Sequence, residues 1–215
     1  MEKGLIITLP DYDDVTQYLS IWSSDIIEKA EQVSVKVRKI VGKENTKENF
    51  EKSLFKLDYK MVVFNGHGSS NAIKGHNNNI MIEKEENGRI LKNRITYARS
   101  CESADSLGEL VKTSDGCFIG YKMPFMFYVD INRIGNPKKD AVAEIFLSSS
   151  NQIPISIIKG NTCKEAHENS KKQILKSINK ILRNKTSDAF RIAEALFNNY
   201  SAQTIIGNES ASLNQ

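Results

Sequence analysis

Strand-length apolar stretches and amphipathic segments alternate along this chain of 215 residues. The apolar stretches lie at 4–9, 61–64, 94–98 and 117–121, and such runs are typical of strands that are buried on both faces. Segments with apolar residues at helical spacing lie between them. The alternation predicts an α/β fold with a mostly parallel central sheet and helices on both faces.

Polar residues in front of the amphipathic segments mark the expected helix starts in the first half of the chain. Asp13 or Asp14 is expected to cap a helix that continues to Ala30, and Asn45 with Glu48 forms an expected capping box for the next. A third helix is predicted directly after Cys101.

The second half of the chain carries further start signals. Asn136-Pro137 predicts a helix that begins with proline, and the apolar stretch at 154–158 predicts a short strand. A long amphipathic helix is expected over 162–185, and Ser187 is expected to cap one more helix. A last strand or tail is expected at 203–206.

The polar region 69–93 interrupts this alternation. Apolar residues at 80–82 and 89–91 lie on either side of Asn87-Gly88, and Asn-Gly is the strongest short signal for a β-hairpin. We therefore expect a surface hairpin that turns at Asn87-Gly88. Alternating apolar residues at 34–40 predict a weaker edge strand.

Composition narrows the class of protein. The chain is 40% hydrophobic and 26% charged, with a net charge of +4, which is typical of a soluble globular domain and too mild to indicate nucleic acid. We expect one domain over residues 1–215, without a membrane span or signal peptide. Three cysteines without a CxxC pair favour a reducing cytoplasm and argue against a disulfide framework or a zinc site. No cofactor or metal is expected.

Two strand ends carry residues suited to catalysis. His67 follows the strand at 61–64 between two glycines, and Cys101 follows the strand at 94–98. A cysteine is a nucleophile as thiolate, which a helix N-terminus and a nearby histidine favour. If the two strands are neighbours, both side chains reach one crevice at the carboxyl edge of the sheet. The N–H groups of Gly68 and Cys101 are then placed to bind an oxyanion.

The two blocks Val-Val-Phe-Asn-Gly-His-Gly-Ser (62–69) and Ile-Thr-Tyr-Ala-Arg-Ser-Cys-Glu-Ser (95–103) resemble the signature blocks of the caspase-like (clan CD) cysteine peptidases. The order of His and Cys matches, and the chain looks most similar to the bacterial CHAT-domain proteases. The resemblance implies a caspase-like three-layer sandwich. It departs from caspases proper, which have Gln-Ala-Cys at the nucleophile and a longer spacing.

The resemblance implies a cysteine endopeptidase that cleaves protein substrates through a His67–Cys101 dyad and a thioester. No third catalytic residue is identified from the sequence, and a dyad requires none. A cytoplasmic protease needs restraint, so we expect a regulatory protein partner, a homodimer or autoprocessing within 69–93.

Substrate preference depends on charges near the crevice. In several relatives the residue two positions before the Cys lines the pocket for the P1 side chain, which here is Arg99 and favours an acidic or polar P1. Asp11, Asp13 and Asp14 follow the first strand and favour a basic P1 instead. Arg99 is alternatively a structural partner of one of these aspartates.

Other functions stay open at this point. The main alternative is a catalytically inactive caspase-like domain that binds protein or nucleic acid through its basic helix near 164–185. A hydrolase of small esters is a third reading. The remaining histidines and cysteines are not expected to be catalytic. We expect His76 and His167 at the surface, Cys117 in the core and Cys163 at a helix start.

Overall fold

A computed structural model describes residues 1–184 and 186–214. In chain order the strands are β1 (Glu2–Leu9), β2 (Lys36–Val41), β3 (Tyr59–Asn65), β4 (Ala72–Lys74), β5 (Ile80–Glu83), β6 (Ile95–Arg99), β7 (Cys117–Tyr121) and β8 (Gln203–Gly207). The α-helices are α1 (Asp14–Trp22), α2 (Ser24–Gln32), α3 (Lys47–Leu57), α4 (Ala141–Ile158), α5 (Cys163–Asn184) and α6 (Ala189–Ala202). The buried strands expected from the apolar stretches are confirmed, and so are an edge strand at β2 and the last strand at β8.

Within the described residues, the main sheet has six strands in the order β2-β1-β3-β6-β7-β8. The first five strands run parallel, and β8 pairs antiparallel with β7. Short crossovers bring β1, β3 and β6 side by side, so their carboxyl ends meet at one edge. The predicted mostly parallel α/β sheet is therefore confirmed.

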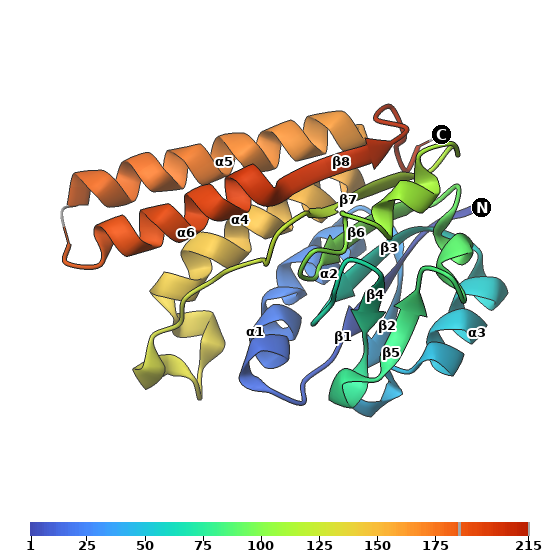
Figure 1. The fold of residues 1–215 in the computed structure, drawn as a ribbon, viewed down its shortest axis with the longest axis horizontal. Helices are drawn as coiled ribbons and strands as arrows, with labels where there is room; N and C mark the ends of the chain where they lie inside the picture. Colours follow the sequence, from blue (N-terminus) through green and yellow to red (C-terminus); the bar gives the residue numbers. More distant parts are fainter. Residues whose placement is uncertain (185, 215) are drawn as a thin grey trace.

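Alternate residues of the strands build a core on each face of the sheet. Leu5 and Ile7 of β1 pack in a cluster with residues of α2, α4 and α5. Ile6 of β1 and Phe64 of β3 pack in a second cluster with residues of α3. Helices thus cover both faces, and the molecule has three layers (Figure 1).

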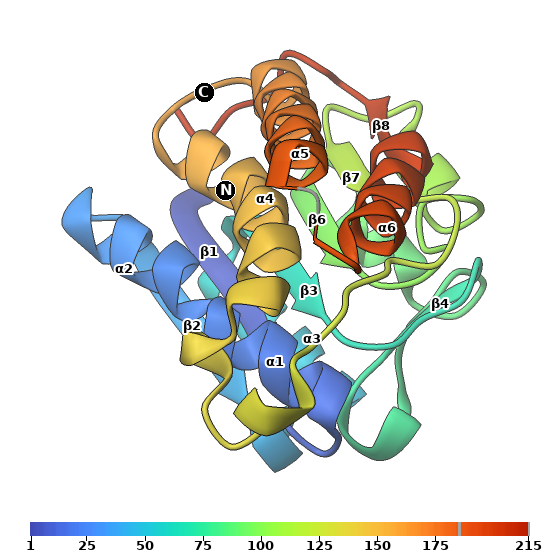
Figure 2. The same ribbon diagram turned by 90° about the vertical axis from the view of Figure 1, so that its left-hand side faces the viewer.

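The helices α5 and α6 extend beyond the sheet. They form an antiparallel pair that Figure 2 views almost end-on. A separate apolar cluster joins them to the start of α4 and includes Phe146, Ile174 and Leu196. The predicted long amphipathic helix and the helix after it are confirmed, whereas Lys185 lies outside the described residues.

The strand predicted at 154–158 is wrong, because these residues complete α4. Pro154 lies inside this helix, and the apolar residues around it are buried on several of its sides. A short apolar run does not by itself distinguish a buried strand from a buried helix. Among the described helices, α4 is the one long and apolar enough to cross a membrane, but 61% of it is buried in the fold, as in a core helix.

The hairpin predicted at Asn87-Gly88 is also wrong. The hairpin is formed by β4 and β5, and its turn passes through Asn77 and Asn78 in the left-handed region. Asn87 instead accepts a hydrogen bond from the Glu83 N–H and donates to the Met81 carbonyl. Residues 88–91 form a short 3-10 helix (Gly88–Leu91).

Several helix starts differ from the predicted ones. The predicted helix from Asp13 to Ala30 is broken at Ser23 into α1 and α2. The cap of α3 is Thr46 rather than Asn45, and the cap of α4 is Asp140, because Asn136-Pro137 opens only a 3-10 turn (Pro137–Lys139). Asp188, rather than Ser187, occupies the cap position of α6.

Candidate active site

The ends of β3 and β6 bring the two predicted catalytic residues to the same edge. Asn65 pairs with Arg99 in the parallel register, so His67 and Cys101 each lie two residues beyond a paired position. The Gly66 N–H donates to the Arg99 carbonyl at 3.3 Å. Close packing continues past this point, since a Cβ on Gly68 would lie only 2.0 Å from Ser100 Oγ. The predicted neighbourhood of the two loops is confirmed.

His67 is held by a carboxylate that the sequence did not connect with it. Its Nε2 lies 2.8 Å from Oδ2 of Asp13, and both side chains are about one-third exposed, at 33% and 36%. Asp13 was expected to contact substrate, but the structure places its carboxylate on His67. The parallel pairing of β1 with β3 brings the two loops together, which a sequence pattern alone does not reveal.

Asp13 is fixed by a second role as the cap of α1. Its side chain accepts a hydrogen bond from the Thr16 N–H at 2.8 Å, and Thr16 completes a capping box. Burial by itself raises the pKa of the Asp13 carboxyl, but hydrogen bonds from Thr16 and His67 outweigh it and hold the pKa below its usual value. Asp13 is therefore ionised at neutral pH and orients the imidazole.

This contact also decides which ring nitrogen carries the proton. An ionised carboxylate only accepts hydrogen bonds, so Nε2 of His67 donates to Asp13. Nδ1 is then the nitrogen available to accept a proton. In the described part of the chain, the His67 ring makes no other hydrogen bond.

Cys101 is a free thiol of intermediate exposure, whereas Cys117 and Cys163 are fully buried. A hydrogen bond with Cys163 and burial raise the pKa of Cys117; the predicted core position of Cys117 is confirmed. The helix predicted after Cys101 is wrong. Turns follow it, and only a short 3-10 helix (Gly108–Val111) forms, so no helix dipole acts on this thiol.

The residue after Cys101 has a strained backbone. Glu102 has a φ of +57°, a region that non-glycine residues without a short polar side chain rarely adopt. Its N–H donates to the Met123 carbonyl at 3.4 Å. Strained positions of this kind gather at functional sites, and this one turns the chain sharply just after the thiol.

Two backbone N–H groups near Cys101 are free of partners. The Ser69 N–H donates to Ala72, and the Lys74 N–H donates to the His67 carbonyl, so the hairpin uses the groups on either side of Gly68. Within residues 1–184 and 186–214, neither the Gly68 N–H nor the Cys101 N–H donates to a protein acceptor. Their role as an oxyanion hole stays a prediction.

Arg99 does not line a pocket, and the prediction that it contacts substrate is wrong. Its side chain is 0% exposed, and burial lowers the pKa of its guanidinium. Its hydrogen-bond acceptors are Asn65 Oδ1, Ser150 Oγ, Asn151 Oδ1, Ser23 Oγ and the Leu19 carbonyl. None is an aspartate, so the alternative pairing with Asp11, Asp13 or Asp14 is also wrong.

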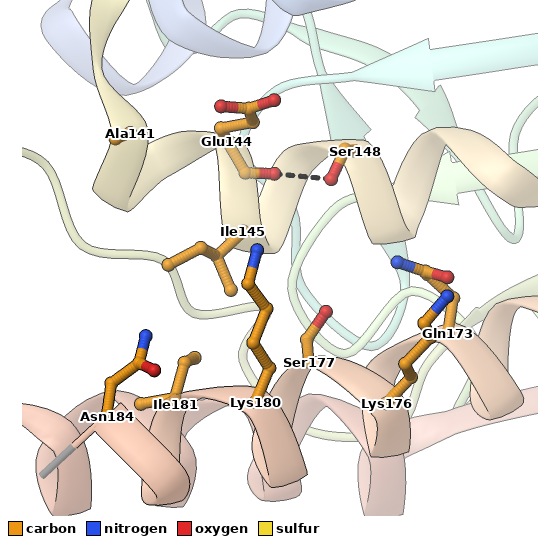
Figure 3. A pocket seen from close by; sticks show the side chains of 10 residues that line it. All are labelled: Ala141, Glu144, Ile145, Ser148, Gln173, Lys176, Ser177, Lys180, Ile181 and Asn184. Carbon is orange, nitrogen blue, oxygen red and sulfur yellow. Dashed lines mark hydrogen bonds between the residues drawn. The ribbon is translucent and has the colours of Figure 1, made fainter.

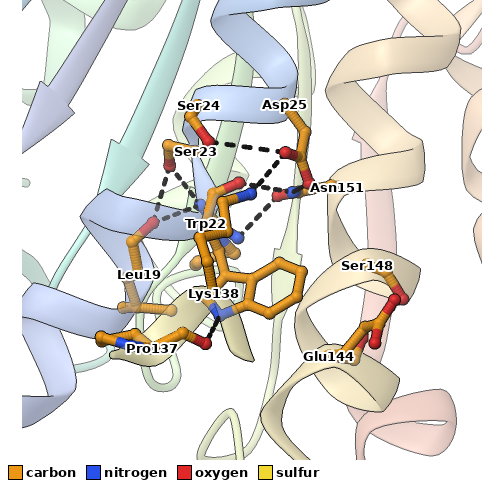
Figure 4. A network of polar contacts seen from close by, with 11 residues as sticks. Leu19, Trp22, Ser23, Ser24, Asp25, Pro137, Lys138, Glu144, Ser148 and Asn151 are labelled. Carbon is orange, nitrogen blue, oxygen red and sulfur yellow. Dashed lines mark hydrogen bonds and ion pairs between the residues drawn. The ribbon is translucent and has the colours of Figure 1, made fainter. Parts of the chain in front are cut away.

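These bonds make Arg99 a clamp beneath the two strand ends. Asn65, which precedes His67 by two residues, accepts from Arg99 at 2.8 Å and donates to the Thr8 carbonyl at 2.6 Å. On the other side, the guanidinium donates to Ser23, at the break between α1 and α2, and to Asn151 of α4 (Figure 4). One buried layer thereby joins β1, β3 and β6 under the loops that carry Asp13, His67 and Cys101.

The other predicted residues lie at or beyond the rim of this site. Asp11 is exposed and lies against Gly42, and Asp14 is exposed in the first turn of α1. His76 is half-buried rather than at the surface, because the hairpin tip folds back and its ring packs edge-on against Tyr12 at 5.6 Å. His167 is also partly buried, and burial lowers its pKa.

One groove of the molecule lies away from the candidate site. It has a volume of about 470 Å³ and runs between α4 and α5 (Figure 3), and none of its lining residues belongs to the loops around His67 and Cys101. The candidate site lies at the carboxyl edge of the sheet, where the loops after β1, β3 and β6 meet. Among the described residues, no three His, Cys, Asp or Glu side chains gather as metal ligands would.

Comparison with known proteins gives the class of the fold. Neither a scan against protein-family models nor a search of curated sequences found a match. A solved complex of the RgpB pro- and mature domains from Porphyromonas gingivalis superposes with a TM-score of 0.62 at 10% identity, over 97% of this chain and 48% of that one. The Arg-specific cysteine proteinase gingipain R (RgpB) gives 0.60 at 12%, over 97% and 46%. The fold is caspase-like.

The caspase-like fold confirms the architecture expected from the two sequence blocks. Gingipain R is described as an Arg-specific cysteine proteinase, and this chain shares its fold. Identities of 10% and 12% show the fold alone. The chain spans about half the length of these two solved structures.

Proposed function

We propose that this chain is a cysteine endopeptidase in which Cys101 is the nucleophile and His67 the general base and acid. The observation that carries the proposal is the 2.8 Å contact between His67 Nε2 and Asp13. It leaves Nδ1 as the proton acceptor in a loop that packs against the loop of Cys101. The caspase-like fold supports it, because peptidases of that fold exist.

The residues supply each step of amide hydrolysis. His67 Nδ1 takes the thiol proton while Cys101 Sγ attacks the substrate carbonyl carbon. The N–H groups of Gly68 and Cys101 stabilise the resulting oxyanion. As the C–N bond breaks, His67 returns the proton to the leaving amine. Water, deprotonated by His67, then hydrolyses the thioester and frees the thiol. Asp13 keeps the Nε2 proton in place throughout.

We further propose that the P1 residue is basic. Arg99 is buried, which removes the reason to expect an acidic P1. The exposed charges that flank the site are mainly acidic, namely Asp11, Asp14 and Glu102, with Lys74 on the hairpin side. Gingipain R, whose fold is similar, is described as Arg-specific.

Control by a protein partner is part of this proposal. One of the similar solved structures is a complex between a pro-domain and a mature domain, so a protein of similar fold binds another protein segment.

The test is hydrolysis of a peptide library by the purified chain, with cleavage sites identified by mass spectrometry. Cleavage is expected after Arg and Lys, and both Cys101→Ala and His67→Ala should abolish it. Asp11→Asn with Asp14→Asn should weaken the preference for a basic P1 while cleavage persists. Cleavage that survives in Cys101→Ala, or folded wild-type protein that cleaves no peptide, would overturn the proposal.

A further inference from the structure

The pair of helices α5 and α6 carries the positive charge of the molecule. Residues 171–202, which we call the arm, hold seven basic and two acidic residues, whereas the whole chain has a net charge of only +4. The rest of the chain is therefore slightly acidic. The arm extends past the sheet along the long axis of the molecule (Figure 1).

Four cations of the arm lie on α5 without an ion-pair partner among the described residues. Lys172, Lys176 and Lys180 repeat every four residues and so lie about 6 Å apart along α5. Together with Arg183 they line a shallow groove on its outer side, and two of them also border the groove of Figure 3. In the described part of the chain, none of these four has a carboxylate within 4.0 Å, while Lys164 and Arg191 do.

Large apolar side chains are exposed on the same arm. Phe190 is 82% exposed in the first turn of α6, and Phe197 is 55% exposed two turns later. Leu175 and Leu182 of α5 are 39% and 38% exposed. They lie outside the apolar cluster that joins α4, α5 and α6, and Phe190 has most of its surface in water.

We propose that the arm binds the surface of an anionic lipid bilayer. The headgroup layer of such a bilayer attracts lysine and arginine, and the hydrocarbon just beneath it accepts Phe and Leu side chains. The binding is peripheral, and it adds a property that is independent of peptide hydrolysis. The sequence analysis singled out the same basic helix, but as a surface for protein or nucleic acid.

Two other occupants fit the arm less well. A second copy of the chain would bring two surfaces of equal positive charge together, which repel each other. The phosphates of a nucleic acid would engage the four cations but leave Phe190, which stands clear of the surface, in water. A bilayer interface engages both kinds of side chain without a complementary pocket.

The test is co-sedimentation of the full chain with vesicles of phosphatidylcholine alone and of phosphatidylcholine mixed with phosphatidylglycerol. Binding is expected only to the mixed vesicles and should weaken as salt is raised. Replacing Lys172, Lys176 and Lys180 by Gln should lower the affinity roughly a hundredfold. Phe190→Ser should lower it about tenfold.

Matched controls separate the arm from charge and exposure in general. Phe55→Ser removes a phenylalanine that is 67% exposed on α3, and Lys36, Lys39 and Lys112 are exposed lysines paired with glutamates. Neither Phe55→Ser nor the triple Gln variant of these lysines should change binding. Absence of binding to mixed vesicles, equal losses in the controls, or binding of a single-stranded oligonucleotide instead of vesicles would overturn the proposal.

Discussion

Arg99 and Lys180 are both cations without a carboxylate in contact, yet they lie in opposite surroundings. Arg99 is sealed under the site edge and donates to five neighbouring residues, whereas Lys180 lines an open groove on the arm. A buried cation is tolerated only when all of its donors are used. Near the candidate site, a buried charge fixes the positions of the strand ends. On the arm, exposed charges are available to bind a ligand.

The largest difference is expected in stability. Arg99→Met removes the buried cation and leaves several buried acceptors unpaired, so we expect a loss of about 3–5 kcal/mol in the free energy of unfolding. Lys180→Met should change it by less than about 0.5 kcal/mol. Urea unfolding measures the free energy of unfolding of both variants. Equal losses would contradict the distinction between the buried and the exposed cation.

The next effect concerns activity. Asp13→Asn removes the charge that orients His67 but keeps a residue that caps helices well, so the fold should survive. We expect kcat/KM for a cleaved peptide to fall about a hundredfold. Asp115→Asn, an exposed aspartate just before β7 at the opposite edge of the sheet, serves as the control and should leave kcat/KM nearly unchanged. A similar fall in both variants would remove Asp13 from the mechanism.

The pH dependence of stability should report the same carboxylate. Since the folded-state pKa of Asp13 lies below its usual 3.8, its contribution is complete above that value and is lost as the pH falls through the lower folded-state pKa. The free energy of unfolding of Asp13→Asn should therefore depend less steeply on pH between about 5 and 2. The triple Gln variant of the arm should follow the wild type over this range. A wild-type slope in Asp13→Asn would contradict the role of Asp13.

The smallest effect is expected at the strained turn. Glu102→Gly places a glycine where φ is +57° and should stabilise the chain by about 1 kcal/mol. Asn77 has a φ of +53°, but asparagine tolerates this region, so Asn77→Gly should change little. Thermal unfolding distinguishes the two, and a destabilised Glu102→Gly would show that the turn is not strained.

The sequence predicted the parts of the site that lie on strands. Strand length and apolar character placed the segments before His67 and Cys101, and the α/β alternation indicated that they meet at one edge. The resemblance to caspase-like peptidases agrees with the observed fold, while its closeness to the CHAT group stays a prediction.

The missed features depend on contacts between distant segments. Asp13 reads as a helix cap in the sequence and performs that role, and only strand pairing shows that its second oxygen reaches His67. Arg99 carries a charge that suggests solvent, but its neighbours from α1, α2 and α4 bury it completely. Pro154 suggests a helix end, yet α4 continues through it. Tertiary packing adds a second contact to the local role of Asp13 and overrides the local pattern at Arg99 and Pro154.

The reactivity of Cys101 tests the central claim most directly, which is that His67 and Cys101 share one solvent-reachable edge. The measurement is the rate of alkylation of each cysteine by iodoacetamide in the folded chain, mapped by mass spectrometry. Cys101 should react at least about tenfold faster in the wild type than in His67→Ala, with Cys117 and Cys163 unmodified. Equal rates in the two proteins, or modification of the buried cysteines before Cys101, would contradict the account.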